Sequence, residues 1–144
     1  MKYLRGPVVA LLAFVIGVVV SPIHFSKQGM GYGRMRDGGG GFSITSYRSS
    51  YFIQLNFAHA GHVSEEQANT QFDELVAEAV EVISITPKVD EHGTIVGRRA
   101  VAMFLDGETD RHFASVFWTQ GKLVHSINST SLMHVLEFEE QNAN

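Results

Sequence analysis

The sequence predicts a small α+β domain that follows an N-terminal membrane-spanning helix. Three observations lead to this expectation: an apolar run over residues 7–25, an amphipathic pattern over residues 64–80, and strand-like stretches on both sides of that pattern. About 100 of the 144 residues follow the apolar run and the glycine-rich segment behind it. That length suits one modest hydrophobic core, so we expect residues 42–144 to form a single domain.

The apolar run, PVVALLAFVIGVVVSPIHF, decides where we expect the chain to reside. Thirteen consecutive residues of it carry no polar side chain, and Ile23 and Phe25 extend it to the ~17 to 20 residues needed to cross hydrocarbon. Residues 1–6 form a basic n-region, which in signal sequences stays in the cytoplasm. We therefore predict a signal anchor over residues 7–25 in the plasma (inner) membrane, with the C-terminal domain outside the cytoplasm.

A cleaved secretory signal is the alternative, because the same segment also fits a basic n-region followed by an h-region. Signal peptidase requires small residues at the −3 and −1 positions. The chain instead offers Val19 and Ser21, followed by Pro22, and after these the bulky pair His24 and Phe25. The uncleaved anchor is favoured, and secretion after cleavage is the second interpretation.

A glycine-rich segment, residues 26–41, follows the predicted anchor. It carries seven of the fourteen glycines and few side chains that could enter a core, so it predicts a flexible tether close to the membrane surface. These glycines do not follow a predicted strand, and the sequence contains no Gly-Lys-Ser/Thr. A phosphate-binding loop is therefore not indicated.

The domain begins with a predicted strand and helix. Residues 50–58 alternate between apolar and polar positions, as a half-buried strand does. Ser64 and Gln67 form a capping box, and apolar residues follow at helical spacing as far as Val80. From Glu81 onward the β-branched residues of EVISITPKV favour a strand.

The rest of the chain predicts an antiparallel meander with a short C-terminal helix. Tight turns are indicated at residues 90–93 and 106–111, and Gln120-Gly121 suits a two-residue hairpin loop. The predicted strands cover residues 94–105, 112–119 and 122–127. In the last segment Leu132, Val135 and Leu136 share one helical face, and we expect the acidic C-terminal end to fray.

The order strand, helix, then four strands is similar to the cystatin-like layout, in which a curled antiparallel sheet packs on one helix. This resemblance concerns the fold alone. The inhibitory Gln-x-Val-x-Gly hairpin of the cystatins is missing, because the corresponding turn here is Asp-Glu-His-Gly. Protease inhibition is therefore not implied.

Composition excludes several classes of site. The chain has no cysteine, so it can form neither disulfides, nor thiolate zinc sites, nor a thiol nucleophile. Its net charge of −4 gives no general attraction to nucleic acid. No cofactor motif is present, and we predict no cofactor.

Histidines supply the first candidate site residues. His59 and His62 have a spacing that can chelate a metal, but no third ligand or HExxH motif accompanies them, so they are weak candidates. If Gln120-Gly121 is the hairpin loop, Trp118 opposes Leu123 and Val116 opposes His125. His125 would then lie beside Trp118 as a core histidine rather than act as a general base.

Arg98 and Arg99 give the strongest physical indication. Adjacent strand residues point to opposite faces, so one guanidinium must point toward the helix-covered side and needs a partner there. An ion pair with Glu74, Glu78 or Glu81 is the favoured interpretation. The alternative is an anion-binding cavity between helix and sheet, with Trp118 as one of its walls. The candidate ligand contacts are Arg98, Arg99, Trp118 and His125.

These features favour a membrane-anchored, extracytoplasmic binding or assembly module. Its expected partners are the lipid bilayer and a neighbouring membrane or envelope protein, and nucleic acid is not among them. The alternative is a small enzyme or ligand-binding protein that uses a cavity between helix and sheet. No arrangement of residues demands catalysis, so the sequence favours a protein that is not an enzyme.

Overall fold

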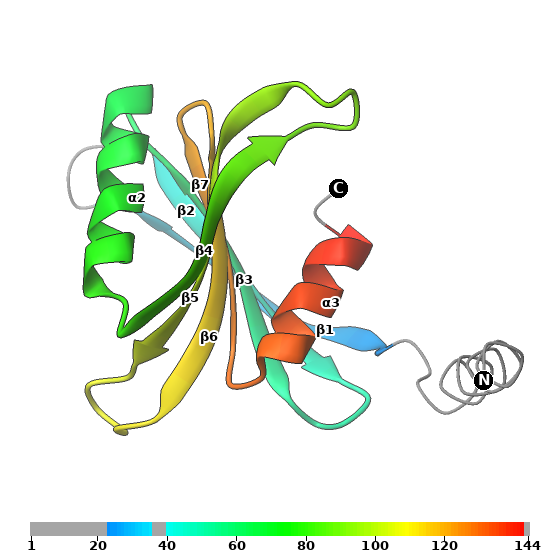
Figure 1. The fold of residues 1–144 in the computed structure, drawn as a ribbon. Helices are drawn as coiled ribbons and strands as arrows, with labels where there is room; N and C mark the ends of the chain where they lie inside the picture. The colour runs from blue at the N-terminus through cyan, green and yellow to red at the C-terminus, as the bar shows by residue number, and fades with distance from the viewer. Residues whose placement is uncertain (1–22, 36–39, 143–144) are drawn as a thin grey trace, which may run out of the picture.

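The computed structural model describes residues 23–35 and 40–142. In this part of the chain a seven-stranded sheet carries one helix on each face (Figure 1), which confirms the predicted α+β class. The strands are β1 (Phe25–Arg34), β2 (Gly41–Ser49), β3 (Gln54–Gly61), β4 (Glu81–Val89), β5 (Ile95–Leu105), β6 (His112–Gln120) and β7 (Leu123–Ser129). The helices are α2 (Glu65–Glu78) and α3 (Leu132–Asn142).

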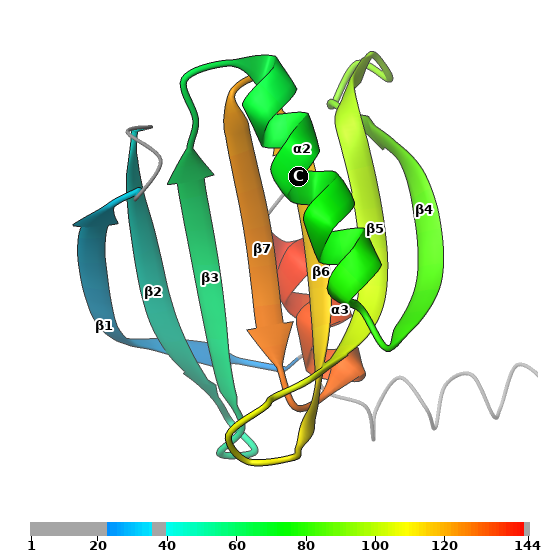
Figure 2. The same ribbon diagram turned by 90° about the vertical axis from the view of Figure 1, so that its left-hand side faces the viewer.

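The sheet is antiparallel throughout, with the strand order β1-β2-β3-β7-β6-β5-β4. Helix α2 connects β3 to β4 at the far edge, so the chain returns through β5 and β6 and places β7 beside β3. The predicted series of strand, helix and four strands corresponds to β3, α2 and β4 to β7. The prediction of one packed helix is incomplete, because α2 covers one face and α3 the other (Figure 2).

The glycine-rich segment is the first correction. We predicted a flexible tether over residues 26–41, but Phe25–Arg34 forms β1, which pairs along β2. Backbone hydrogen bonds to β2 order this strand, whose glycines have no side chains to pack. Gly33 also makes room for a neighbour, since a Cβ atom there would lie 2.5 Å from the ring of Phe42.

The predicted membrane span lies mostly outside the described residues. Its last part, however, belongs to the domain: Ile23 is buried, and the ring of Phe25 packs edge-on against Phe138 of α3, with centroids 5.1 Å apart. We had predicted that these two residues extend the membrane-spanning run. That part of the prediction is wrong, because both pack into the folded domain. Among the described residues no helix is long and apolar enough to cross a membrane.

The strand predicted over residues 50–58 begins later than expected. Tyr51 and Phe52 lie in the turn between β2 and β3, and β3 starts at Gln54. The hydroxyl of Ser49 accepts hydrogen bonds from the backbone N–H groups of Tyr51 and Ile53, both at 3.2 Å. A serine that bonds the following backbone favours a turn over a continuous strand, and this local chemistry outweighs the alternating pattern.

The pairing register of the β6–β7 hairpin differs from the prediction by two residues, because the loop is shifted by one position. Its loop is Gly121-Lys122 rather than Gln120-Gly121, because Gly121 takes the left-handed conformation with φ 59°. Trp118 consequently opposes His125 instead of Leu123. A shift of two residues keeps every side chain on its predicted face, so His125 still lies on the face of Trp118.

Two hydrophobic layers hold the helices to the sheet. Ser64 caps α2 as predicted, since its Oγ accepts the Gln67 N–H at 3.1 Å, and Phe72 buries the inner face of the helix. Helix α3 buries Val135 and Phe138, whereas Leu136, which we assigned to the same face, is 38% exposed. Phe138 anchors the half of α3 that we expected to fray. The layer beneath α3 contains Leu55, Val101, Ala114, Val116, Trp118 and Ile127.

Candidate functional site

A cavity of about 590 Å³ opens beside the β4–β5 hairpin, on the face of the sheet that α3 covers. Its size lies within the range of small-molecule sites, which is roughly 300 to 1,000 Å³. We call it the histidine pocket. Its lining residues are Phe57, His59, Lys88, Val89, Asp90, Glu91, Val96, Trp118, Gln120, His125 and Asn142.

Aromatic rings from three neighbouring strands form one wall of the histidine pocket. His59 of β3 opposes His125 of β7, and His125 opposes Trp118 of β6, so the three side chains form a row across the sheet. The rings of Trp118 and His125 stack with centroids 5.2 Å apart and an angle of 29°. Phe57 lies 4.3 Å from the ring of His59. The row therefore provides an aromatic wall, in which His125 stacks on Trp118 and the ring of His59 stands at 82° to that of His125.

The two histidines contact each other through their Nδ1 atoms, which lie 2.5 Å apart. One Nδ1 must donate its hydrogen while the other accepts, so the two rings cannot both be protonated in this arrangement. Burial, followed by repulsion from His59 and Lys88, lowers the pKa of His125 from 6.5 to about 4. Burial also lowers the pKa of His59. The pair is thus uncharged at neutral pH.

Lys88 supplies the ammonium group of the pocket. Its Nζ lies 4.8 Å from the centre of the Trp118 ring, within the distance of a cation–π interaction. The residue is only 9% exposed, although β4 is the outermost strand at its edge of the described sheet. The ammonium therefore faces the aromatic wall rather than bulk water.

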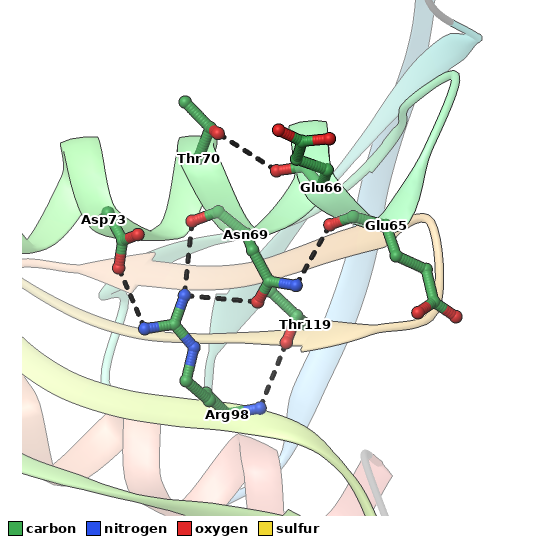
Figure 3. Close-up of polar contacts among 7 residues, drawn as sticks. All are labelled: Glu65, Glu66, Asn69, Thr70, Asp73, Arg98 and Thr119. Carbon is green, nitrogen blue, oxygen red and sulfur yellow. Dashed lines mark hydrogen bonds and ion pairs between the residues drawn. The ribbon is translucent and has the colours of Figure 1, made fainter.

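Arg98 belongs to the opposite face and contacts α2 (Figure 3). Its Nη1 pairs with Asp73 at 2.8 Å, and its Nη2 donates to the carbonyl and side-chain oxygens of Asn69. The guanidinium also lies over the ring of Phe72, 4.3 Å from its centre. The predicted ion pair is present, but with Asp73 instead of Glu74, Glu78 or Glu81. Arg98 thus connects α2 to β5 and does not line the histidine pocket.

Arg99 points toward α3 and forms the more buried ion pair. Its Nη2 and Nε bond the carboxylate of Glu139 at 2.7 and 2.9 Å, and the two side chains are 21% and 14% exposed. The two arginines therefore point to opposite faces, as predicted. Because Trp118 opposes Arg99 rather than lying on the α2 face with Arg98, it cannot be a wall of a cavity under α2.

His59 and His62 do not converge. His59 contacts His125, whereas His62 is buried and its Nε2 contacts the side-chain oxygen of Gln71 on α2. Within residues 23–35 and 40–142 no group of three histidine, cysteine, aspartate or glutamate side chains could hold a metal ion. The structure therefore offers the predicted chelating pair no third ligand.

A second cavity, of about 430 Å³, lies between α2 and the sheet. We call it the helix groove. Apolar side chains dominate its lining, with Phe42, Ile44, Leu75, Phe104, Phe113 and Val124 among them. Ser115, Ser126 and Asn128 add polar groups. The groove lies between helix and sheet, where we predicted an anion-binding cavity, but its lining contains neither arginine and gathers fewer ionisable groups than the histidine pocket does.

Sequence reasoning identified Trp118 and His125 as candidate ligand contacts, and both line the histidine pocket. It missed the contributions of His59 and Lys88, which depend on β3 lying beside β7 and on β4 curving over β6. Only the tertiary arrangement of the sheet could have revealed them. The chain matches no protein-family model, and no curated protein or solved structure shows significant similarity to it.

Proposed function

We propose that the domain is a binding module that takes a small planar ligand into the histidine pocket. We further propose that the N-terminal apolar run anchors the chain to a membrane, with the domain outside the cytoplasm. The observation that carries the ligand proposal is the convergence of Trp118, His125, His59 and Lys88 on one cavity of about 590 Å³. Pockets that combine apolar walls with a few convergent polar groups are the usual sites of small-molecule binding.

The chemistry of the lining indicates the class of ligand. The rings of Phe57, His59, His125 and Trp118 favour a flat aromatic body. The ammonium of Lys88 favours an acceptor group on that body, such as a carboxylate, whereas the Asp90 carboxylate of the lining already accepts the backbone N–H groups of His92 and Thr94 and the Glu91 side chain is 81% exposed. The uncharged imidazole pair can donate or accept a hydrogen bond without placing a second positive charge in the pocket. A planar aromatic acid meets all three conditions.

The same lining favours binding over catalysis by a hydroxyl or thiol nucleophile. Within the part of the chain that the structure describes, the lining contains no serine, threonine, tyrosine or cysteine, and therefore no hydroxyl or thiol nucleophile. Ser115 and Ser126 belong to the opposite face and line the helix groove. A small enzyme that uses the imidazole pair as an acid or base remains the alternative, and turnover of the bound compound would distinguish it.

A thermal-shift screen of the full-length chain tests the ligand proposal. We expect planar aromatic acids to raise the melting temperature, whereas straight-chain acids of similar size leave it unchanged. Val89→Trp adds a bulky ring at the pocket rim and should abolish the shift. Ile85→Trp is the matched control, because Ile85 lies on the same strand at similar exposure, 52% against 49%, but outside the pocket. Equal shifts in both variants would contradict this site.

Strand β4 favours a second function, assembly with another protein. It forms an edge of the described sheet, and four of its aliphatic side chains are between 39% and 52% exposed: Val82, Ile83, Ile85 and Val89. An exposed apolar edge strand can accept a strand from a partner. Crosslinking in native membranes should give a product that Ile85→Lys removes. A product that survives this substitution would exclude β4 as the interface.

A further inference from the structure

The turn between β2 and β3 presents two aromatic side chains to solvent. Tyr51 is 58% exposed and Phe52 is 84% exposed, so both leave apolar ring surface in contact with water that burial would stabilise. Tyrosine is enriched at the interface between a bilayer and water, and phenylalanine is among the apolar residues that interfacial segments bury there.

The turn holds these rings in place through its backbone. Ser49 N–H donates to the carbonyl of Ile53 at 2.8 Å, and Phe52 N–H donates to the carbonyl of Ser49 at 2.9 Å. The hydroxyl of Ser49 also contacts Nε2 of His134, at 3.0 Å, which fixes the turn to α3. Phe52 itself has φ 61°, a left-handed conformation that is unfavourable for an aromatic residue. Local stability therefore does not explain a phenylalanine at this position.

The turn also lies where the chain enters the domain. Ser50 N–H donates to the carbonyl of His24 at 2.8 Å. In the sequence His24 comes four residues after Val20, the last residue of the uninterrupted apolar run. Four extended residues span at most about 14 Å. If the run crosses a membrane, the turn cannot be far from the membrane surface.

The histidine pocket lies at the other end of the sheet. Leu55, beside the turn, pairs with Ser129, whereas Gly61 at the far end of β3 pairs with Leu123 beside the hairpin loop. Six residues of strand separate these two levels, about 20 Å. Figure 1 shows the same arrangement, with the β4–β5 hairpin and the β2–β3 turn at opposite ends of the molecule.

We infer that the Tyr51–Phe52 turn is a membrane-contact surface whose rings enter the interfacial layer of the bilayer. The inference rests on the proposed membrane anchor. The domain then stands on this turn, and the histidine pocket opens away from the membrane. The β5–β6 turn at the same end carries the carboxylates of Asp106, Glu108 and Asp110 against one cation, Arg111. The contact is therefore apolar in origin and does not require anionic lipid.

Depth-dependent quenching in vesicles tests this inference. The chain has no cysteine, so Phe52→Cys provides a single labelling site for a fluorophore. The full-length variant is reconstituted in phosphatidylcholine vesicles that contain a spin-labelled lipid with its nitroxide near the headgroup. Tyr32→Cys, at a tyrosine on β1 that is 76% exposed, and Ile95→Cys, beside the pocket and 67% exposed, are the matched controls. We expect at least twofold stronger quenching at position 52 than at either control.

Two failures can be told apart. If alkaline carbonate releases the whole chain from the vesicles, the anchor and the membrane-contact surface are both wrong. If the chain is retained but position 52 is quenched no more than positions 32 and 95, the anchor stands and the membrane-contact surface is overturned.

Discussion

At the scale of single residues, the histidine pocket depends on keeping ionisable groups in their neutral form. His125 is packed against Trp118, and its burial, the neighbouring His59 and the ammonium of Lys88 each disfavour a second positive charge. A protonated His125 would repel Lys88, and it could keep its contact with His59 only while the Nδ1 of His59 stays unprotonated. The pocket is therefore assembled for neutral pH, and acid should loosen it.

The lowered pKa of His125 makes stability depend on pH in a defined direction. The unfolded chain binds a proton near pH 6.5, whereas the folded chain resists it until about pH 4, so stability is complete above pH 6.5 and falls as pH decreases through this window. We expect a loss of about 1 to 2 kcal/mol, because partial exposure of the ring screens the effect.

Urea unfolding between pH 4 and 7 checks this prediction. His125→Gln should reduce the pH dependence in this window, and the same substitution at exposed His112 controls for loss of an imidazole. A difference in stability between the unsubstituted chain and His125→Gln that stays constant with pH would contradict the prediction.

Gly97 is a residue whose lack of a side chain is required by packing. A Cβ atom there would lie 1.9 Å from the carbonyl oxygen of Thr119 on the neighbouring strand. Gly97→Ala should therefore force β5 and β6 apart and destabilise the domain by about 2 kcal/mol or more. Thermal unfolding measures the loss. Gly107→Ala, where no atom lies within 4 Å of the added Cβ, is the control and should change stability little.

At the scale of elements, two ion pairs connect the helices to strand β5. Arg98 reaches α2 and Arg99 reaches α3, because neighbouring strand residues point to opposite faces. The two pairs differ in exposure: the side chains of Arg98 and Asp73 are 40% and 67% exposed, against 21% and 14% for Arg99 and Glu139. They should therefore differ in energetic weight.

Substitution of each arginine by methionine separates the two contributions. Arg99→Met leaves the carboxylate of Glu139 largely buried without its partner and should cost about 2 to 4 kcal/mol. Arg98→Met removes an exposed pair and should cost about 1 kcal/mol. Chemical denaturation gives both values. A larger loss for Arg98→Met would mean that the attachment of α2, not of α3, dominates the stability of the sheet.

The β2–β3 turn offers a test of strain. Phe52 has φ 61° and buries little surface. Phe52→Asn should therefore stabilise the domain by about 0.5 to 1 kcal/mol in the absence of lipid. Tyr51→Asn, at a neighbouring position without positive φ, should give no such gain. Both variants are compared with the unsubstituted chain by thermal unfolding. All three proteins are measured in the same lipid-free buffer, with the same detergent where one is needed for solubility. Destabilisation by Phe52→Asn would show that the ring supports the fold.

Elements with a strong local signal were predictable from the sequence. The cap of α2 at Ser64, the glycine turn at Gly93 and the β-branched strand β4 each follow from nearby residues. Strand β1 was not predictable, because its glycines have a weak strand preference and it is ordered by pairing with β2. The β6–β7 loop was misplaced by one position, since glycine fits either place in a two-residue turn.

At the scale of the whole molecule, the strand order separates the two ends of the domain for which we propose functions. The β2–β3 turn lies where the chain enters the domain, and the histidine pocket lies at the opposite end, beside the β4–β5 hairpin (Figure 1). Helix α3 runs between them: His134 near its start contacts Ser49, and Asn142 at its end lines the pocket. The proposed membrane contact and the proposed ligand site therefore do not compete for the same surface.

The candidate site was only half predictable because it depends on long-range neighbours. Trp118 and His125 come from one hairpin, and sequence reasoning could place them on one face. His59 joins them only because the α2 crossover leaves β3 next to β7. Lys88 joins them because β4 pairs with β5 at the edge of the sheet, which places the ammonium over the Trp118 ring. Local patterns do not encode either arrangement.

The fluorescence of Trp118 tests ligand binding in the histidine pocket most directly. It is the only tryptophan in the chain, so any change in its emission arises at the pocket wall. The full-length chain is titrated with the planar aromatic acid that raises the melting temperature most, and we expect a saturable change in emission. Lys88→Met should weaken the affinity obtained from this titration at least tenfold. Emission that stays constant up to the solubility limit of the compound would contradict a ligand site at Trp118.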